Sequence, residues 1–282
     1  MRVLLIIPAF NEQQALGGLL AEIQALRAAG GAGVQLSAVV VDDGSVDRTG
    51  EVAKAGGVRL LRLCKNLGIG GAVQAGLILA HRERFDCAVQ IDGDGQHPPG
   101  ELRHLLAAVA RQGEPRADLV VGTRYRDRDQ DGFRSTLLRR LGSAWLRGVL
   151  RLVTGLRLTD PTSGFRLYGA RALRLFSLTY PYDYPEPESL AVACAAGLTV
   201  VEVPVTMRER QGGRSSISGM QSAYYMLKVT LAVVLAYLRT PRRLPEAEIE
   251  AEIEAGVDAG RADVDADGRA DASKEEASRA VA

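Results

Sequence analysis

Short runs of aliphatic and β-branched residues alternate with segments of helical apolar spacing over residues 1–122, and this alternation constrains the fold more than any other feature. The segments expected to form strands are residues 3–7, 38–41, 59–63, 88–91 and 119–121. The segments expected to form helices are residues 12–29, 47–55, 70–84 and 99–111. Nearly continuous Val, Ile and Leu in strands separated by crossover helices indicates a mostly parallel sheet that is buried on both faces. The sequence therefore predicts an α/β fold with helices flanking a mostly parallel central sheet.

The pattern loosens after residue 122, where residues 124–151 are rich in arginine. A further strand is expected over residues 199–205, where it rejoins the sheet. The apolar segment at residues 222–238 contains Lys228, and it falls short of the roughly 20 residues that span a bilayer. A core helix, a contact in a homo-oligomer and a helix lying on a membrane surface remain the alternatives for this segment.

The formal net charge of +1 conceals an uneven distribution along the chain. Residues 245–282 carry 12 acidic and 4 basic side chains, a net charge of −8, which leaves +9 on residues 1–244. A basic body favours anionic ligands such as nucleotides, phosphates or an acidic membrane surface, whereas no arginine-rich block indicates a nucleic-acid partner. The acidic tail, residues 244–282, is repetitive in Ala, Asp and Glu and is expected to be disordered.

The cysteines and the N-terminal residues bear on the cellular compartment. Cys64, Cys87 and Cys194 are odd in number and widely separated, which argues against a disulfide framework or a zinc cluster. The first apolar run is too short for the core of a signal peptide and is not followed by a small-residue cleavage site. We expect a cytoplasmic protein, with the inner face of the cell membrane as the alternative location.

Two carboxylates follow the expected strand at residues 88–91. Asp92 and Asp94 are two residues apart, and extended backbone places such positions on the same side. Paired carboxylates suit Mg²⁺ or Mn²⁺, which complete their coordination with substrate phosphates and water. The spacing predicts a metal and diphosphate site, and solvated turn residues are the alternative.

Other polar clusters also follow expected strands, and ligands of open α/β sheets bind beyond the carboxyl ends of the strands. Asp42 and Asp43 can accept hydrogen bonds from a base or a ribose, while Ser45 or Asp47 can cap the helix that follows. The glycines within residues 65–71 let backbone N–H groups approach an anion. They follow the third strand and lack the last glycine of the dinucleotide fingerprint, and the chain contains no P-loop, so both of these nucleotide-binding classes are excluded.

Four motifs share an order and a spacing that resemble glycosyltransferase family 2. They are Pro8-Ala9-Phe10-Asn11-Glu12, Asp42-Asp43-Gly44-Ser45, Asn66-x-Gly68-x-Gly70 and Asp92-x-Asp94-x-Gln96-x-Pro98. Three further motifs, at residues 122–125, 160–166 and 210–215, are similar to the dolichol-phosphate mannose synthase group and other polyprenyl-phosphate glycosyltransferases. The resemblance covers residues 3–220.

The resemblance implies a GT-A fold and an inverting transfer of a hexose from a nucleoside diphosphate sugar. Implied to bind the nucleotide sugar are Pro8, Glu12, Asp42, Asp43, Asn66, Gly70, Asp92 and Gly93. Implied ligands of Mg²⁺ or Mn²⁺ are Asp92, Asp94 and Gln96. Residues 1–122 would form the nucleotide-sugar-binding half, residues 123–243 the acceptor-binding half, and residues 244–282 the acidic tail.

The resemblance also implies a set of acceptor and catalytic residues. The acceptor-binding residues would be Arg124, Arg139, Arg166 and Ser215. The catalytic residues would be Asp94, Arg124 and Arg210. Asp160 and Glu188 join them as candidate catalytic residues on the ground of their carboxylates, not of the resemblance. Arginine suits a phosphate acceptor because its planar fork grips phosphate oxygens bidentately.

Two kinds of acceptor remain as alternatives. One is polyprenyl (dolichyl or undecaprenyl) phosphate, and the other is a hydroxyl of a glycan, lipid or secondary metabolite. A phosphate is already an anionic nucleophile, whereas a hydroxyl needs a general base within hydrogen-bond reach. Candidate bases are Asp160, Glu186 and Glu188, although the two glutamates can also be read as a solvated turn. A hypothesis from another class is a noncatalytic nucleotide-sugar sensor or membrane-associated scaffold, against which the intact acidic motifs argue.

Overall fold

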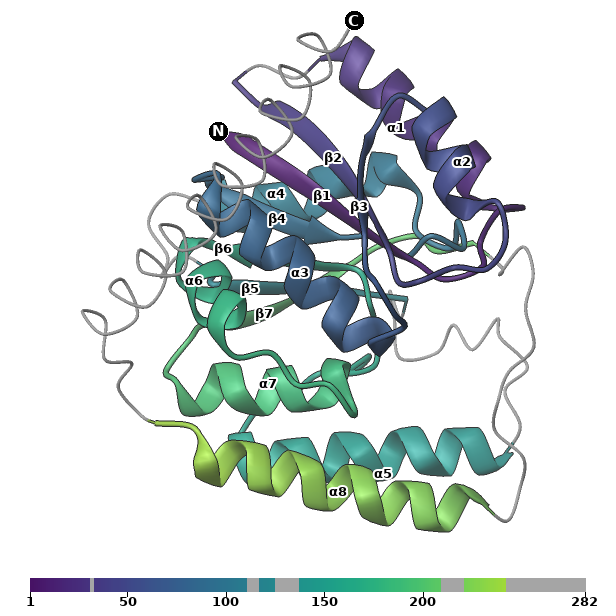
Figure 1. Ribbon diagram of the computed structural model, residues 1–282. Coiled ribbons are helices and arrows are strands. Elements are labelled where there is room, and N and C mark those ends of the chain that lie inside the picture. The colour runs from purple at the N-terminus through teal and green to yellow at the C-terminus, as the bar shows by residue number, and fades with distance from the viewer. Residues whose placement is uncertain (31–32, 111–116, 125–136, 209–220, 242–282) are drawn as a thin grey trace, which may run out of the picture. The chain divides into compact units, whose positions relative to one another are not determined.

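The computed structural model describes residues 1–30, 33–110, 117–124, 137–208 and 221–241, which build one seven-stranded sheet covered by helices (Figure 1). The strands are β1 (Arg2–Ala9), β2 (Gln35–Asp42), β3 (Arg59–Arg62), β4 (Cys87–Gln90), β5 (Leu119–Thr123), β6 (Arg166–Gly169) and β7 (Val200–Pro204). The helices are α1 (Leu16–Ala29), α2 (Thr49–Ala55), α3 (Gly68–Arg82), α4 (Leu102–Ala110), α5 (Leu137–Thr154), α6 (Ala170–Leu178), α7 (Pro185–Ala195) and α8 (Gln221–Arg239), with a short 3₁₀ turn η1 (Pro99–Glu101) before α4.

The strand order is β3-β2-β1-β4-β6-β5-β7. Strand β6 runs antiparallel to its neighbours β4 and β5, and the other neighbouring pairs are parallel. The predicted α/β class with a mostly parallel central sheet is therefore confirmed. The predicted division of the chain at residue 122 assigns a different ligand to each half, and this division stays a prediction. In the sheet the two halves are interleaved, because β6 of the second half lies between β4 and β5 of the first.

The two faces of the sheet are covered by different helices. Alternate residues of β1 pack with α1 and α4 in one apolar core, to which Leu5, Leu20 and Leu105 belong. Helices α3 and α6 cover the other face and contact each other. Because both faces are buried, the strands are apolar on both sides, as the sequence indicates.

Helices α5, α7 and α8 pack against one another beside the sheet. Figure 1 shows α5 and α8 running side by side below α7. The side chain of Trp145 on α5 donates a hydrogen bond from Nε1 to Oγ1 of Thr230 on α8, at 3.0 Å. Within the described part of the chain, no helix is both long enough and apolar enough to cross a membrane.

The first helix and strand β6 are two of the places where the fold differs from the sequence prediction. The first helix begins at Leu16 rather than at residue 12, because the chain turns at Asn11, which has a φ of 57°. Strand β6 was not predicted, because it is short and begins with an arginine. Arg166 nevertheless has no exposed surface. One of its hydrogen-bond acceptors is Ser189 on α7, which is distant from it in the sequence.

The contact between α3 and β1 depends on a glycine. A Cβ at Gly76 would overlap the side chain of Ile6, which is fully buried. We expect Gly76→Ala to lower the free energy of unfolding by about 1–3 kcal/mol, because an added methyl group strains a packed core. Denaturant unfolding measures this change.

The matched control is Gly148→Ala in α5, where an added Cβ meets no atom within 4 Å. There the better helix propensity of alanine is expected to add up to about 1 kcal/mol. A Gly76→Ala variant that is as stable as the unchanged protein would contradict the close approach of α3 to β1.

Candidate active site

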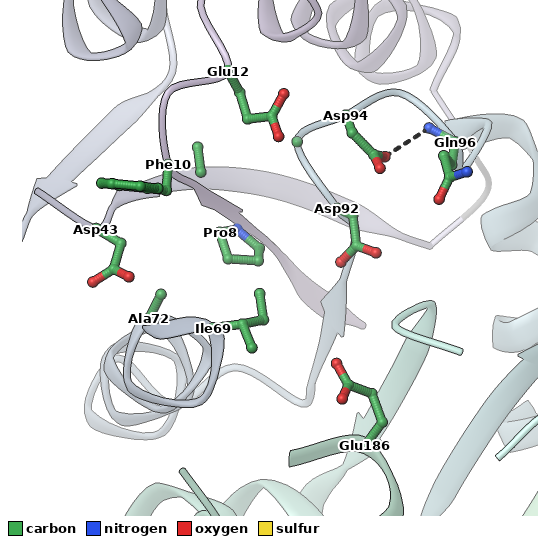
Figure 2. A pocket seen from close by; sticks show the side chains of 12 residues that line it. Pro8, Phe10, Glu12, Asp43, Ile69, Ala72, Asp92, Asp94, Gln96 and Glu186 are labelled. Carbon is green, nitrogen blue, oxygen red and sulfur yellow. Dashed lines mark hydrogen bonds between the residues drawn. The ribbon is translucent and has the colours of Figure 1, made fainter. Parts of the chain in front are cut away.

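A pocket of about 390 Å³ lies beyond the carboxyl ends of β1, β2 and β4 and extends to the first turns of α3 and α7 (Figure 2). It is lined by Pro8, Ala9, Phe10, Glu12, Asp43, Ile69, Ala72, Asp92, Gly93, Asp94, Gln96 and Glu186. The position agrees with the general rule that open α/β sheets bind ligands beyond the carboxyl ends of their strands.

The pocket is strongly acidic. Five of its lining side chains are carboxylates, and among the described residues that line it there is no Lys or Arg. Figure 2 shows Glu12, Asp43, Asp92, Asp94 and Glu186 around one common space. Like charges in a partly buried site raise one another's energy, so the pocket favours a ligand that brings positive charge with it.

Asp92 lies against Gly164 and His97, and Phe165 supports His97 from behind. A Cβ at Gly164 would lie 2.7 Å and 2.8 Å from the two carboxylate oxygens of Asp92, so the backbone at Gly164 lies directly against this carboxylate. The backbone N–H of Asp92 donates to Nδ1 of His97 at 3.2 Å. The His97 ring in turn stacks on Phe165, with ring centroids 5.1 Å apart.

Asp94 reaches the pocket through a turn rather than through extended backbone. The chain turns at Gly93 and Asp94, and Gly95 has a φ of 76°, which favours glycine. The Oδ1 atom of Asp94 accepts the backbone N–H of Gln96 at 3.0 Å. The two aspartates therefore line the same pocket, as the sequence predicts. The reason differs from the predicted one, because a turn and not extended backbone places them on the same side.

The oxygen donors at Asp92, Asp94 and Gln96 bear on the divalent cation that the sequence predicts. In the described part of the chain, no three His, Cys, Asp or Glu side chains cluster closely enough to hold a metal ion by themselves. The carboxylates of Asp92 and Asp94 and the amide of Gln96 are nevertheless hard oxygen ligands, and Mg²⁺ is often held by one or two carboxylates while phosphates and water complete its shell. The residues therefore fit a cation whose coordination a diphosphate completes.

Asp43 is fixed by the loop that enters α3. Its two carboxylate oxygens accept the backbone N–H groups of Leu67, at 2.7 Å, and Gly68, at 2.9 Å. Burial raises the pKa of Asp43 above its ordinary value, and the two backbone hydrogen bonds act in the opposite direction. Gly44 lets this loop approach, because a Cβ there would lie 2.9 Å from the Asn66 backbone nitrogen. The carboxylate is thus placed at the rim where β1, β2 and α3 meet.

A second group of polar residues lies at the end of β5. Arg124 donates from Nε and Nη2 to the two carboxylate oxygens of Asp160, at 2.8 Å and 3.1 Å. The backbone N–H groups of Thr159 and Asp160 both donate to the carboxylate of Glu202 on β7. This network holds Arg124 at the point where β5 ends.

Residues 4–176 match glycosyl transferase family 2. The chain belongs to this family. It is 34% identical to an undecaprenyl-phosphate mannosyltransferase of Micrococcus luteus, over 78% of this chain and 88% of the relative. It is 32% identical to a polyprenol monophosphomannose synthase of Mycolicibacterium smegmatis, over 81% and 85% of the two chains.

Solved structures of similar shape carry the GT-A fold. Glucosyl-3-phosphoglycerate synthase of Mycobacterium tuberculosis, solved with Mn²⁺, UDP-glucose and phosphoglyceric acid, aligns with a TM-score of 0.62 at 22% identity, covering 85% of this chain and 80% of the other. Mannosyl-3-phosphoglycerate synthase of Rubrobacter xylanophilus aligns with a TM-score of 0.60 at 20% identity, covering 85% and 73%. The family match and the fold together make this protein a glycosyltransferase with a GT-A fold.

Most of the residues predicted to bind the nucleotide sugar line the glycosyltransferase's pocket, and three do not. Pro8, Glu12, Asp43, Asp92 and Gly93 line the pocket, as do the predicted metal ligands Asp94 and Gln96. Outside its lining are Asp42, which accepts the Ser45 N–H at 2.9 Å, Asn66, which accepts the Gly68 N–H at 3.1 Å, and Gly70, which lies against Pro181 and Tyr182. These three residues shape the loops that carry the pocket.

The structure brings Glu186, rather than Glu188, to the pocket. The carboxylate of Glu186 points toward Asp92 (Figure 2). Burial raises the pKa of Glu186, while the positive charge of Arg166 lowers it. Glu188 instead accepts the backbone N–H of Tyr184 at 2.8 Å at the start of α7. Of the two candidate bases in this segment, only Glu186 lines the pocket, because the first turn of α7 directs the two side chains differently. The catalytic role predicted for Glu188 stays a prediction.

The predicted acceptor residues are only partly described. Arg124 and Asp160 pair with each other, as given above, and Arg166 is fully buried. Arg210 and Ser215 lie outside the described residues, and Arg139 belongs to α5 while its side chain is not described. Their predicted roles stay predictions, whereas a fully buried Arg166 does not present its guanidinium to an acceptor.

Four apolar lining residues were not predicted. Ala9, Phe10, Ile69 and Ala72 border the pocket near Asp43. Phe10 is 45% exposed and Ile69 is 40% exposed, and exposure of this kind is common among surface apolar residues. Ala9, Phe10 and Ile69 stand within the family motifs, but this position gave no indication of a role, and Ala72 stands outside the motifs.

We expect Gly164→Ala to weaken Mn²⁺ binding in the presence of UDP by about 10–100-fold, because the added methyl group displaces the Asp92 carboxylate, and loss of support around a metal ligand commonly costs that much. Titration followed by the electron paramagnetic resonance signal of free Mn²⁺ measures the change. Gly100→Ala is the control, since a Cβ there meets no atom within 4 Å. Equal affinities in the two variants would show that Asp92 does not depend on Gly164.

Proposed function

We propose that this glycosyltransferase moves a hexose from a nucleoside diphosphate sugar to polyprenyl phosphate, with Mg²⁺ or Mn²⁺ bound between Asp92, Asp94 and the diphosphate. The observation that carries the donor half of this proposal is the pocket of five carboxylates without a Lys or Arg among its described lining residues. A diphosphate alone would be repelled there, whereas a diphosphate bound to a divalent cation would not. The Mn²⁺ and UDP-glucose in a protein of the same fold are consistent with this view.

The pocket offers each part of the donor a suitable neighbour. Asp43, at the rim beside Phe10 and Ile69, can accept hydrogen bonds from a base or a ribose. Asp92, Asp94 and Gln96 would hold the cation, which when bound stabilises the charge that develops on the departing nucleoside diphosphate. Glu12, at the end of β1, faces the same space. The sugar would then extend toward Glu186 and the end of β5.

The acceptor half of the proposal rests on the relatives and on the state of the candidate bases. Both named relatives transfer mannose to polyprenyl carriers according to their names. Asp160 is a poor candidate base because both of its carboxylate oxygens already accept hydrogen bonds from Arg124 and because it is not among the residues that line the pocket. A phosphate acceptor needs no base, because its oxygen bonds to the anomeric carbon as the bond to the donor diphosphate breaks, and no proton moves.

We infer that Arg124 receives the acceptor phosphate. Its side chain is 40% exposed in spite of the pair with Asp160, and it lies at the end of β5. Arg139, Arg210 and Ser215 are proposed to contribute to the same site. A phosphate bridging such arginines would be gripped by charge-assisted hydrogen bonds, which are about twice as strong as neutral ones.

Transfer from a panel of radiolabelled nucleotide sugars to undecaprenyl phosphate tests the function. We expect label in the lipid phase with Mn²⁺ or Mg²⁺ and none with EDTA. In Asp94→Asn the rate should fall at least about 100-fold, because the cation's contribution is worth several kcal/mol. Glu51→Gln is the control, since this side chain is 75% exposed on α2. Full activity of Asp94→Asn would overturn the metal assignment.

A hydroxyl acceptor is the second candidate, and Glu186 is the observation that favours it. This carboxylate is in the pocket, and its raised pKa brings it closer to the range in which bases work. With a hydroxyl acceptor, activity would fall as the pH drops through the raised pKa, and Glu186→Gln would lose about 10²–10⁴ in rate.

With polyprenyl phosphate as the acceptor, we expect Glu186→Gln to retain transfer within about tenfold, because no base is removed. The pH dependence of the variant and of the unchanged protein should then share the same acidic limb. Loss of transfer in Glu186→Gln together with loss of that limb would favour the hydroxyl acceptor. Lipid labelling with each sugar donor, measured from pH 5 to pH 9, separates the two cases.

A further inference from the structure

A buried guanidinium lies beneath the acidic pocket. Arg166 begins β6 and stands opposite Gln90 of β4 and Val121 of β5 in the sheet. Its relative exposure is 0%. Burying a charge is costly unless the group is fully hydrogen-bonded, so the contacts of this side chain indicate what it does for the fold.

The guanidinium makes three hydrogen bonds, all to uncharged oxygens. Its Nε donates to the carbonyl of Ser163 at 2.7 Å, and its Nη2 donates to the carbonyl of Pro161 at 3.0 Å. Its Nη1 donates to Oγ of Ser189 on α7 at 2.6 Å. None of the ion pairs found among the described residues includes Arg166. The planar fork thus joins two segments that are far apart in the sequence.

The first of these segments holds Asp92. The two carbonyls that Arg166 fixes belong to residues 161–165, which we call the Asp92 loop. Gly164 of this loop lies against the Asp92 carboxylate, and Phe165 stacks on the His97 ring that accepts the Asp92 N–H. A shift of the Asp92 loop would therefore move the carboxylate that is proposed to bind the cation.

The second segment holds Glu186. The hydroxyl of Ser189, which accepts from Arg166, donates to the backbone carbonyl of Glu186 at 3.1 Å. Ser189 has no exposed surface, so its bonding is confined to these neighbours. Arg166 therefore contacts the loop that lies against Asp92 and the serine that bonds to the Glu186 backbone. It does not itself line the pocket.

We propose that Arg166 is a positioning residue. It fixes the Asp92 loop and the first turn of α7 relative to each other beneath the proposed donor site, and it does not bind the acceptor. This inference rests on the proposed function in that it takes Asp92 as a ligand of the cation. It replaces the acceptor-binding role that family resemblance implies for this arginine. Lysine cannot substitute, because a compact ammonium group does not reproduce the planar fork that reaches three oxygens on two segments.

The experiment compares Arg166→Lys with the unchanged protein and with Arg171→Lys as the matched control. Arg171 lies on α6, donates to Asp118 at 2.8 Å and is outside the pocket. Mn²⁺ binding is titrated in the presence of UDP and without acceptor, by electron paramagnetic resonance at a temperature where all variants are folded. We expect Arg166→Lys to bind Mn²⁺ about 10–100-fold more weakly and Arg171→Lys to bind it normally.

Steady-state kinetics supply the second readout. We expect the KM for the nucleotide sugar to rise in Arg166→Lys while the KM for undecaprenyl phosphate changes by less than about twofold, because only the donor site is displaced. A raised acceptor KM with unchanged Mn²⁺ affinity would overturn the proposal in favour of acceptor binding. A lowered melting temperature with unchanged Mn²⁺ affinity would overturn it in favour of a purely structural role.

Ser189→Ala keeps the experiment decisive if Arg166→Lys does not fold. This smaller change removes one of the three acceptors and should weaken Mn²⁺ binding in the same direction, whereas unchanged binding would overturn the inference. Mn²⁺ binding by the unchanged protein distinguishes failure of this inference from failure of the proposed function. If it binds no Mn²⁺ in the presence of UDP, the metal-dependent function fails and the inference fails with it, whereas normal binding by the protein and by all variants contradicts the inference alone.

Discussion

The constraint on which the rest of the structure depends is the gathering of five carboxylates around one pocket at the ends of β1, β2 and β4 and at the start of α7. Such a gathering is unfavourable in a partly buried place, and the fold compensates by fixing individual carboxylates with backbone donors. Asp43 accepts from two amides of the loop before α3, and Asp94 accepts from the amide of Gln96. These contacts do not neutralise the negative charge of the pocket. The proposed cation, bound together with a diphosphate, would do so.

Strand β6 links this pocket to the rest of the sheet. Because it runs antiparallel between β4 and β5, the loop that enters it returns to the carboxyl end of β4 and lies against Asp92. The same loop begins at Asp160, whose carboxylate holds Arg124 at the end of β5. One short segment, residues 160–166, therefore supports the proposed donor side through Gly164 and the proposed acceptor side through Asp160. Changes in it are expected to affect both substrates, although through different residues.

Burial distinguishes the arginines of this glycosyltransferase. Arg124 keeps 40% of its side chain exposed while it pairs with Asp160, as suits a residue that meets a phosphate. Arg166 has no exposed surface and donates to neutral oxygens, as suits a residue that organises backbone. The family resemblance implies the same acceptor-binding role for both arginines, and only their surroundings in the structure separate the proposed roles of ligand binding and support.

Much of the architecture follows from the sequence by itself, because it depends on local patterns. Strands that are apolar on both faces require a sheet covered on both sides, and parallel connections bring the ends of β1, β2 and β4 together, so that Asp43, Asp92 and Asp94 meet in one pocket. The tertiary structure alone decided that β6 inserts between β4 and β5, that Arg166 is buried, and that Glu186 rather than Glu188 lines the pocket. Each of these depends on contacts between residues distant in the chain, such as the one between Arg166 and Ser189, or on where a helix places its first turn, and neither composition nor spacing encodes them.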